Sequence, residues 1–309
     1  MRTRRIGTLE VSVIGLGCNN FGGRIDFDRS ADVVSAALDN GITFFDTADI
    51  YGGTKSEEFL GRALGKRREE IVLATKFGMK VDEDRHGAKP DYVRRALEDS
   101  LRRLDTDRVD LYILHAPDAE TPIADTLGAL NDCVKAGKVR EIGCSNFSAE
   151  QLRDAEGAVA DGGARFVSVQ NEYSLLQRGP EAEVLPECRR EGIAFVPYFP
   201  LASGLLTGKY KKGEPPPPGG RLSGMPPEHY AALDDRLQVA DRLAAFAAEQ
   251  GHTLLDLAMS WLLGHDVVAS VIAGATTRAQ VEANAAAGDW VLDDAQLRRV
   301  DTLAPAPAP

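Results

Sequence analysis

Eight short apolar runs, rich in valine, isoleucine and phenylalanine, alternate with helix-like segments along almost the whole sequence. They span residues 14–18, 44–48, 71–76, 109–115, 139–146, 167–173, 194–200 and 270–275. Strands that are apolar on both faces and alternate with amphipathic helices indicate a parallel sheet. Eight such units within 309 residues fit a closed barrel better than an open sheet. The sequence therefore predicts the α/β class: a parallel, eight-stranded (β/α)8 TIM barrel, formed by residues 1–309 as one domain.

Three segments lie outside these eight units. Residues 4–6 and 9–11 flank a Gly-Thr pair, which predicts a short N-terminal β-hairpin that covers the barrel floor. Residues 201–234 form a long irregular loop, rich in proline and glycine, that is either a disordered excursion or a flap at the barrel mouth. Residues 304–309 contain only alanine and proline and are expected to be a frayed, disordered tail.

Side chains at several predicted helix ends carry capping signals. Ser30 precedes one helical pattern, and Ser148 with Gln151 forms a capping-box pattern before another. Gly41 and Gly137 follow two of the helices, where glycine suits a left-handed residue.

The charge and cysteine content narrow the classes of partner. A net charge of −11 repels phosphate backbones, so we expect no nucleic-acid partner. No run approaches the roughly 20 apolar residues of a membrane helix, and the start of the chain lacks the apolar core of a signal peptide. The cysteines follow no paired spacing, which favours reduced thiols and the cytoplasm. They are Cys18, Cys133, Cys144 and Cys188.

Four polar residues stand at or just beyond the ends of predicted strands: Asp46, Tyr51, Lys76 and His115. In a (β/α)8 barrel this is the face that carries the active site. Singly, each has a structural explanation, as a loop cap, a solvated strand end, a core histidine or a packing aromatic. Together they form a set of groups that explain one another, because tyrosine is a poor acid at neutral pH unless its phenolate is stabilised.

The expected stabilising group is the ammonium of Lys76. Lowering the pKa of a tyrosine by about three units corresponds to roughly 4 kcal/mol. A positive charge about 4 Å away supplies a similar energy at an effective dielectric constant of about 20. We therefore expect Lys76, kept charged by Asp46, to lower the pKa of Tyr51, while His115 orients a carbonyl oxygen.

This arrangement resembles the catalytic tetrad of the aldo-keto reductases, and the resemblance spans almost the whole chain. Residues 41–48 (GITFFDTA), followed by Tyr51 and Gly52, are similar to the family's first signature, and residues 142–147 (IGCSNF) to its central one. The resemblance implies hydride transfer from a reduced nicotinamide to an aldehyde or ketone, with Tyr51 as the proton donor and no metal.

The same resemblance implies where the cofactor binds. Ser145, Asn146 and Gln170 would hydrogen-bond the nicotinamide carboxamide, with polar capping of strand ends as the alternative for the last two, and Tyr198 would stack on the ring. Residues 201–209 resemble the family's loop over the pyrophosphate, where backbone amides meet anionic oxygens. The contact residues of that loop, with the proline before it, are Pro200, Leu201, Ser203, Gly204, Leu205 and Lys209.

A helix that opens after the last strand suits a ribose phosphate, because its start combines hydroxyls with a guanidinium. This favours NADPH, with NADH still possible, since Thr276 replaces a lysine of some branches. The adenine contacts resemble those of the family, although Ala283 stands where many relatives have a glutamate. The expected contacts in this region are Gly274, Thr276, Arg278, Gln280 and Asn284.

Residues 15–20 (GLGCNN) follow the first strand but are not a Rossmann motif, because the third glycine is missing and no helix follows at once. We expect Gly17 and Asn19 beneath the cofactor, and Asn20 and Phe21 near the substrate together with Tyr51 and His115. Phe21, Tyr198 and Phe199 are either apolar pocket walls or packing residues. Specificity is expected to depend on the loops at residues 20–27, 79–89 and 116–121, and on the long loop.

The expected partner is therefore a small-molecule carbonyl substrate, with neither nucleic acid nor a membrane. Two other functions remain open. One is a nicotinamide-dependent dehydrogenase of sugars or alcohols from the same family, because the chemistry is reversible. The other is a non-catalytic, nicotinamide-sensing regulatory subunit, as in relatives associated with channels. The sequence names neither the substrate nor the oligomeric state.

Overall fold

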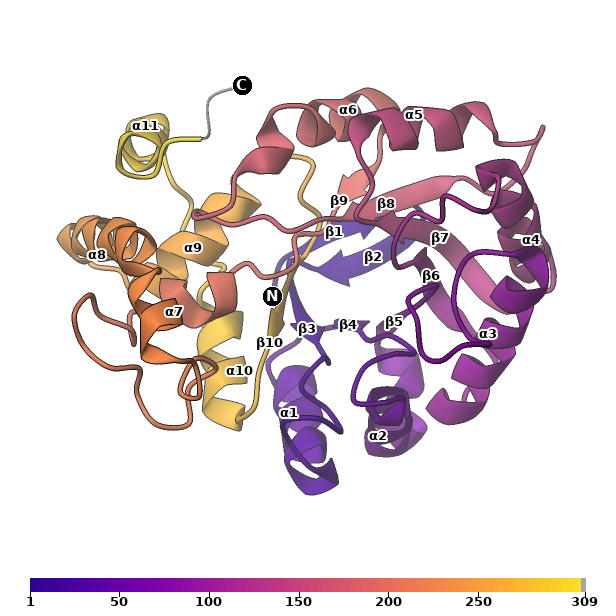
Figure 1. The fold of residues 1–309 in the computed structure, drawn as a ribbon, viewed down its shortest axis with the longest axis horizontal. Coiled ribbons are helices and arrows are strands. Elements are labelled where there is room, and N and C mark those ends of the chain that lie inside the picture. Colours follow the sequence, from indigo (N-terminus) through magenta and orange to yellow (C-terminus); the bar gives the residue numbers. More distant parts are fainter. Residues whose placement is uncertain (307–309) are drawn as a thin grey trace.

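A computed structural model describes residues 1–306, and a sheet of eight parallel strands forms its centre (Figure 1). The strands are β3 (Ile14–Gly17), β4 (Phe44–Asp46), β5 (Val72–Phe77), β6 (Val109–Leu114), β7 (Val139–Ser145), β8 (Phe166–Gln170), β9 (Ala194–Phe195) and β10 (Val271–Gly274). Strands β3 to β9 lie side by side in chain order, and β10 pairs with β3. The amide of Phe195 donates to the carbonyl of Val267 (2.7 Å), and the amide of Ala269 to the carbonyl of Phe195 (2.9 Å). These bonds join the two ends of the sheet, so the predicted (β/α)8 barrel is confirmed.

Helices cover the outside of the barrel (Figure 1). They are α1 (Phe27–Asp39), α2 (Lys55–Leu64), α3 (Pro90–Leu104), α4 (Ile123–Lys135), α5 (Ala149–Gly157), α6 (Val184–Glu191), α7 (Pro227–Ala231), α8 (Asp234–Glu249), α9 (Leu254–Leu263), α10 (Arg278–Ala286) and α11 (Asp294–Leu303). The capping box of Ser148 and Gln151 is present at α5. Gly41 and Gly137 both have φ of +73°, as their positions after helices predict.

Helix α1 begins earlier than the sequence pattern predicts, so the assignment of Ser30 as its cap is wrong. The carboxylate of Asp26 accepts a hydrogen bond from the amide of Arg29 (3.0 Å) and caps the helix. Ser30 lies within the first turn, where its hydroxyl donates to the carbonyl of Asp26 (2.7 Å). The carboxylate of Asp26 stands before the helix and accepts from a free amide of its first turn, whereas the hydroxyl of Ser30 donates to a backbone carbonyl four residues earlier.

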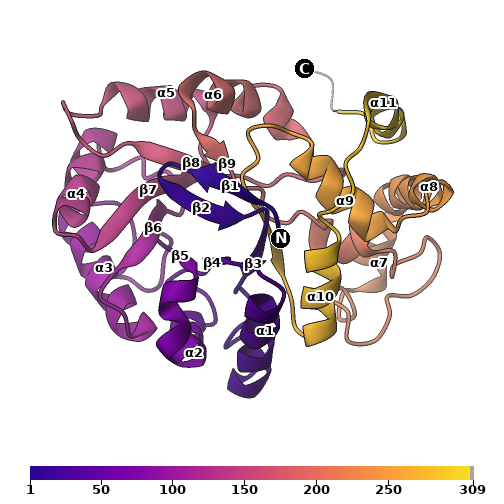
Figure 2. The ribbon, with the colours of Figure 1, turned by 180° about the vertical axis from the view of Figure 1, so that it is seen from behind.

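The predicted hairpin is present at the amino end of the barrel (Figure 2). Strands β1 (Thr3–Ile6) and β2 (Leu9–Ser12) pair antiparallel around a turn in which Gly7 has φ of +56°. Ile6, Leu9 and Val11 are buried against the inward-facing side chains of the barrel. The hairpin therefore seals this end of the barrel, and the other end remains available for a site.

Alternation along each strand divides the side chains between two apolar layers. On β5, Val72 and Ala74 belong to the cluster inside the barrel, whereas Leu73 and Phe77 belong to the cluster between the sheet and the helices. Lys76 follows Ala74 by two residues, so it shares the inward face. A lysine on a buried face next to the carboxyl end of a strand points to a functional site.

The long loop after β9 is more ordered than an irregular excursion. It contains a 3-10 segment, η3 (Ala202–Thr207), and the short helix α7 before α8 begins at Asp234. Of the predicted frayed tail, Ala304 is buried and its carbonyl accepts a hydrogen bond from Arg178 (2.6 Å). Residues 307–309 of that tail lie outside the described residues. Within residues 1–306, every helix is too short or too polar to cross a membrane.

Candidate active site

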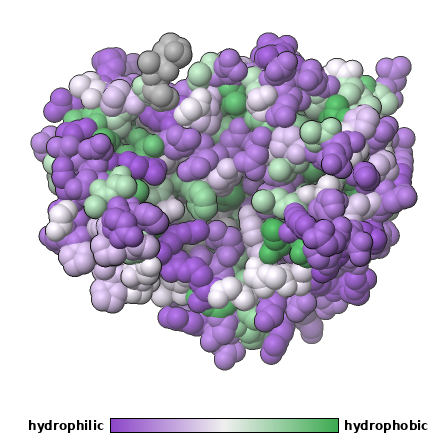
Figure 3. Space-filling model, viewed as in Figure 1, coloured by the Kyte–Doolittle hydropathy of each residue, from purple (hydrophilic) through white to green (hydrophobic). Residues whose placement is uncertain are grey.

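The carboxyl ends of the barrel strands surround a cavity of about 420 Å³, and the surface is hollowed near the centre of this face (Figure 3). Strand ends supply Gly17, Asp46, Lys76, His115, Ser145, Gln170 and Gly274. The loops beyond them supply further residues that the sequence predicts, namely Asn19, Asn20, Tyr51, Asn146, Tyr198, Pro200, Leu201, Ser203, Gly204, Lys209, Thr276 and Gln280. The barrel topology thus brings together residues that are up to about 260 positions apart in the chain.

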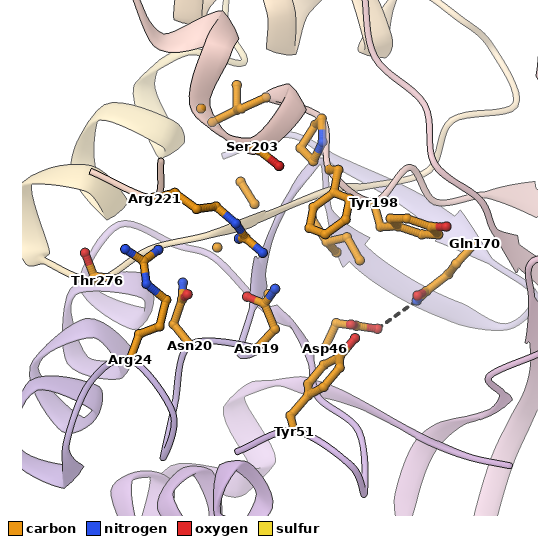
Figure 4. A pocket seen from close by; sticks show the side chains of 18 of the residues that line it. Asn19, Asn20, Arg24, Asp46, Tyr51, Gln170, Tyr198, Ser203, Arg221 and Thr276 are labelled. Atoms are coloured by element: carbon orange, nitrogen blue, oxygen red, sulfur yellow. Dashed lines mark hydrogen bonds between the residues drawn. The ribbon is translucent and has the colours of Figure 1, made fainter. Parts of the chain in front are cut away.

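An ion pair between Asp46 and Lys76 lies at the bottom of the cavity, with both side chains almost fully buried. The ammonium of Lys76 also donates to the carbonyl of Thr47 (2.9 Å). The second carboxylate oxygen of Asp46 accepts a hydrogen bond from Nε2 of Gln170 (2.7 Å), as Figure 4 shows. These contacts fix the ammonium in one place and satisfy the carboxylate that balances its charge.

Tyr51 lies above this pair and beside His115. The Lys76 ammonium lies 5.2 Å from the centre of the Tyr51 ring. The rings of Tyr51 and His115 are 5.8 Å apart and meet edge to face. All four residues of the predicted catalytic set therefore occupy one cluster, with the phenol and imidazole facing the cavity.

The protonation states in the cluster differ in one respect from the expectation. Burial raises the pKa of Tyr51 more than the nearby Lys76 lowers it, so its phenol is less acidic than free tyrosine. Burial opposes the charge of Lys76, but Asp46 and Tyr51 raise the pKa of this ammonium overall. The prediction that Lys76 lowers the pKa of Tyr51 below that of free tyrosine is therefore wrong. Tyr51 is a protonated phenol beside a charged ammonium.

His115 is a neutral imidazole in this cluster. Burial, and next to it the charge of Lys76, lowers the pKa of His115 to about 3. Its Nδ1 is buried and has no hydrogen-bond partner in the described part of the chain. A neutral imidazole keeps one N–H group, which can donate to a ligand without adding a second positive charge next to Lys76.

Amide and hydroxyl groups continue the cavity wall beyond the tetrad. The hydroxyl of Tyr198 donates to the side-chain oxygen of Asn146 (2.7 Å). The amide nitrogen of Asn146 donates in turn to the carbonyl of His115 (2.9 Å) and the hydroxyl of Ser145 (3.1 Å). Strand β9 ends at Phe195, earlier than predicted, so Tyr198 lies in the loop that follows the strand.

The chain turns sharply where it passes over the cavity after Tyr198. Phe199, Ala202, Ser203 and Gly204 have φ values of +51°, +46°, +60° and +98°. A run of left-handed residues turns backbone amides toward one side, an arrangement that suits anionic oxygens. Lys209 lies against this turn, because its Nζ would be 3.5 Å from a Cβ added to Gly204.

Two arginines that the sequence analysis missed also line the cavity, Arg24 and Arg221. They come from opposite sides and approach each other (Figure 4); burial and then the charge of Arg24 lower the pKa of Arg221. Within residues 1–306, neither arginine nor Lys209 forms a salt bridge. Their place in irregular loops hid them, because the sequence does not show which cations lack a carboxylate partner.

Four residues of the predicted set do not line the cavity. Phe21 is fully buried, so it packs beneath its loop and is not a pocket wall. Leu205 and Asn284 are also buried beside the cavity. Arg278 is partly exposed and points to α1, where its guanidinium binds the carboxylates of Asp32 (3.0 Å) and Asp39 (3.3 Å).

The cavity fits a nicotinamide dinucleotide by its chemistry. One end offers amide and hydroxyl groups beside the unpartnered nitrogen of His115. The other offers left-handed backbone and the cations Lys209, Arg24 and Arg221, which lack a carboxylate partner in the described part of the chain and match a pyrophosphate. Such a cofactor combines a neutral nicotinamide, which forms hydrogen bonds, with a doubly charged pyrophosphate.

Comparisons with known proteins agree with this geometry. The sequence pattern described as "Aldo/keto reductase family" matches residues 13–305. The chain is 35% identical to "Probable aldo-keto reductase 1" of Glycine max, over 97% of this chain and 88% of the relative. It is 36% identical both to "Aldo-keto reductase yakc [NADP(+)]" of Schizosaccharomyces pombe, over 96% and 90% of the two chains, and to "Probable voltage-gated potassium channel subunit beta" of Arabidopsis thaliana, over 92% and 89%. The chain therefore belongs to the aldo/keto reductase family.

Proposed function

We propose that the protein transfers a hydride between NADPH and an aldehyde or ketone, and that Tyr51 donates the proton to the carbonyl oxygen. The buried ion pair of Asp46 and Lys76 directly beneath a protonated Tyr51 supports this most strongly. A buried ammonium next to a phenol stabilises the phenolate that proton donation leaves behind.

The chain's own residues act on the carbonyl oxygen. When bound, a reduced nicotinamide supplies the hydride that reduces the carbonyl carbon. Tyr51 gives its phenolic proton to the oxygen as negative charge develops there, so hydride and proton together convert the carbonyl to an alcohol. Lys76 stabilises the resulting phenolate, and Asp46 keeps Lys76 charged and in place. The neutral His115 donates a hydrogen bond that orients the oxygen.

Lys209, Arg24 and Arg221 support a phosphate-rich cofactor, and the name of the Schizosaccharomyces relative includes NADP(+). Thr276 and Gln280 line the far end of the cavity at the start of α10, where a ribose phosphate would reach. Arg278 would have to exchange Asp32 and Asp39 for that phosphate. Titration with NADPH and NADH, followed by quenching of tryptophan fluorescence, tests the preference, and tighter binding of NADH would contradict it.

The decisive experiment replaces Tyr51 by phenylalanine. NADPH oxidation is followed across aldehydes, ketones and sugars, and Tyr51→Phe is expected to lower kcat by about 10²- to 10⁴-fold, because a positioned acid contributes that much. Binding of NADPH should change little. Tyr230→Phe is the matched control, since it removes a buried hydroxyl without a partner among residues 1–306 and outside the cavity wall. A Tyr51→Phe variant within tenfold of the native rate would exclude the proton-donor role.

The similarity to a protein named as a potassium-channel subunit supports a second candidate, a sensor of nicotinamide redox state. A sensor would bind the cofactor and stop after about one turnover per site. Sustained NADPH oxidation with simple aldehydes therefore separates the two functions. A dehydrogenase working in the opposite direction would instead reduce NADP⁺ or NAD⁺ with alcohols or sugars in the same assay series.

A further inference from the structure

Asp49 is a buried carboxyl that the proposed reaction leaves without a role. It lies between Asp46 and Tyr51 in the connection from β4 to α2, and its side chain is 3% exposed. Its backbone amide donates to the carbonyl of Lys76 (3.1 Å). The connection that carries Tyr51 is thus tied at Asp49 to the strand that carries the ammonium.

The side chain of Asp49 lies among groups carried by α2 and α3. The hydroxyl of Tyr92 on α3 donates to Oδ2 over 3.5 Å, and Oδ1 is buried without a partner in the described part of the chain. The titratable groups that share this site are Glu57 on α2, Arg103 and Tyr92 on α3, and Tyr112 on β6.

The one strong cation of this site is already engaged. The guanidinium of Arg103 donates to Glu57 (2.7 Å), which is fully buried and also accepts from the hydroxyl of Thr75 (2.5 Å). An ionised Asp49 would therefore add a second buried negative charge beside a single arginine. Burial and then Glu57 raise the pKa of Asp49 to about 7, so its carboxyl is neutral below that pH.

The backbone on the far side of Tyr51 is also restrained. Gly52 has φ of +60°, and a Cβ added there would lie 2.3 Å from the carbonyl oxygen of Phe21. Gly53 and Thr54 are left-handed as well, with φ of +63° and +78°. Tyr51 is consequently held between two anchors, the Asp49 site against α3 and the contact of Gly52 with the loop after β3.

We propose that Asp49 is a positioning residue for Tyr51, which holds the catalytic phenol in place when its carboxyl is protonated and releases it when the carboxyl ionises. The inference rests on the proposed function, because it assigns a role in the same reaction. It goes beyond that function in placing a pH-dependent control outside the catalytic cluster. Repulsion between Asp49 and Glu57 would move the backbone at Asp49. Because Gly52 is fixed by its contact with Phe21, the residues between them, including Tyr51, would have to absorb that movement.

The test is the dependence of kcat on pH with saturating NADPH and aldehyde, for the native protein and Asp49→Asn. A carboxyl with a pKa of about 7 is about nine-tenths protonated at pH 6 and about one-tenth at pH 8. The native kcat is therefore expected to fall up to about ninefold over this range. Asp49→Asn carries a permanently neutral side chain of the same shape and should lose this fall. Ionisation of Tyr51 itself belongs to a separate limb at higher pH, because burial raises the pKa of that phenol above that of free tyrosine.

A second variant keeps the inference testable if Asp49→Asn folds poorly. Tyr92→Phe removes a hydrogen bond that favours the charged carboxylate, so the midpoint of the fall should move to higher pH. Asp91→Asn, an exposed neighbour whose nearest ion pair is with Arg94 (3.5 Å), is the control and should keep the native profile.

The outcomes separate the two proposals. Turnover with the same pH profile in the native protein, Asp49→Asn and Tyr92→Phe would overturn the role of Asp49 alone. A midpoint that moves to lower pH in Tyr92→Phe would also overturn it. Absence of sustained turnover at every pH would overturn the proposed function, and this inference with it.

Discussion

The imidazole of His115 lies at the end of β6, buried and next to an ammonium, and these surroundings determine its charge. Its pKa is lowered to about 3 by burial and by Lys76, whereas an unfolded histidine takes up a proton near pH 6.5. As the pH falls below about 6.5, the unfolded chain therefore binds a proton that the folded chain refuses. The folded state loses stability over this interval.

We expect His115→Gln to reduce the acid sensitivity of the protein. The histidine contributes a loss of about 1.4 kcal/mol of unfolding free energy per pH unit between about pH 6 and pH 4, and glutamine does not titrate. Urea unfolding at several pH values measures the difference between the two slopes. His86→Gln, at an exposed position, should retain the native slope. Parallel curves for His115→Gln and the native protein would contradict the assigned neutral state.

The sequence identifies the tetrad because each member follows an apolar run, but it does not give the residues' surroundings. The direction of the Tyr51 pKa depends on how completely the phenol is buried, which the linear order does not encode. Arg278 shows the same limit. Its partners Asp32 and Asp39 lie about 240 positions away on α1, so only the fold shows that the guanidinium is already paired.

The last helix, α11, is joined to the rest of the molecule in part through a buried arginine, Arg178. Arg178 donates to Glu181 (2.6 Å), to Asp301 on α11 (2.8 Å) and to the carbonyl of Ala304 (2.6 Å). Its guanidinium also lies 5.0 Å from the ring of Trp261 on α9. One side chain therefore links three separate parts of the chain.

Arg178→Met keeps an aliphatic stem but leaves these acceptors without their donor. We expect a loss of about 1–3 kcal/mol in the free energy of unfolding, because the hydrogen bonds of a buried, charged donor are lost. Urea denaturation measures this loss. Carbonyl reduction at low temperature should be retained, since Arg178 lies outside the cavity wall. Arg298→Met, at an exposed position on α11, is the control, and equal stabilities for both variants would refute the role of Arg178.

The first residues of the strands can be predicted from the sequence, because a regular apolar pattern marks them. All eight barrel strands begin within one residue of the prediction, because each lies in an apolar run with polar boundaries. The end of β9 is missed, since the apolar run continues to residue 200 while Phe199 takes a left-handed φ of +51°. The start of α1 is missed because Asp26, Asp28 and Ser30 are all able to cap a helix, and their competition is decided in three dimensions.

The distribution of charge over the whole molecule has a consequence for cofactor binding. The chain carries a net charge of −11, yet Lys209, Arg24 and Arg221, which form no ion pair among residues 1–306, gather at one cavity. The three cations thus attract the phosphates of the cofactor, while the net negative charge of the chain repels them. Both contributions are screened as the Debye length falls from about 10 Å at 0.1 M salt to about 3 Å at 1 M, but the close contacts dominate once the ligand is near.

We expect the dissociation constant of NADPH to rise several-fold between about 0.05 and 0.5 M salt, because contacts between phosphates and exposed cations weaken with screening. Fluorescence titration at a series of salt concentrations measures the slope. NADH has one phosphate fewer and serves as the matched ligand, with a shallower slope. An affinity for NADPH that does not change with salt would show that the three cations do not contact the phosphates.

The N-terminal hairpin places residue 1 away from the cavity. Met1 is 46% exposed, and it precedes the strand that closes the amino end of the barrel, on the side opposite the cavity (Figure 2). A surface attachment through the first residue would leave the entrance facing the bulk solution.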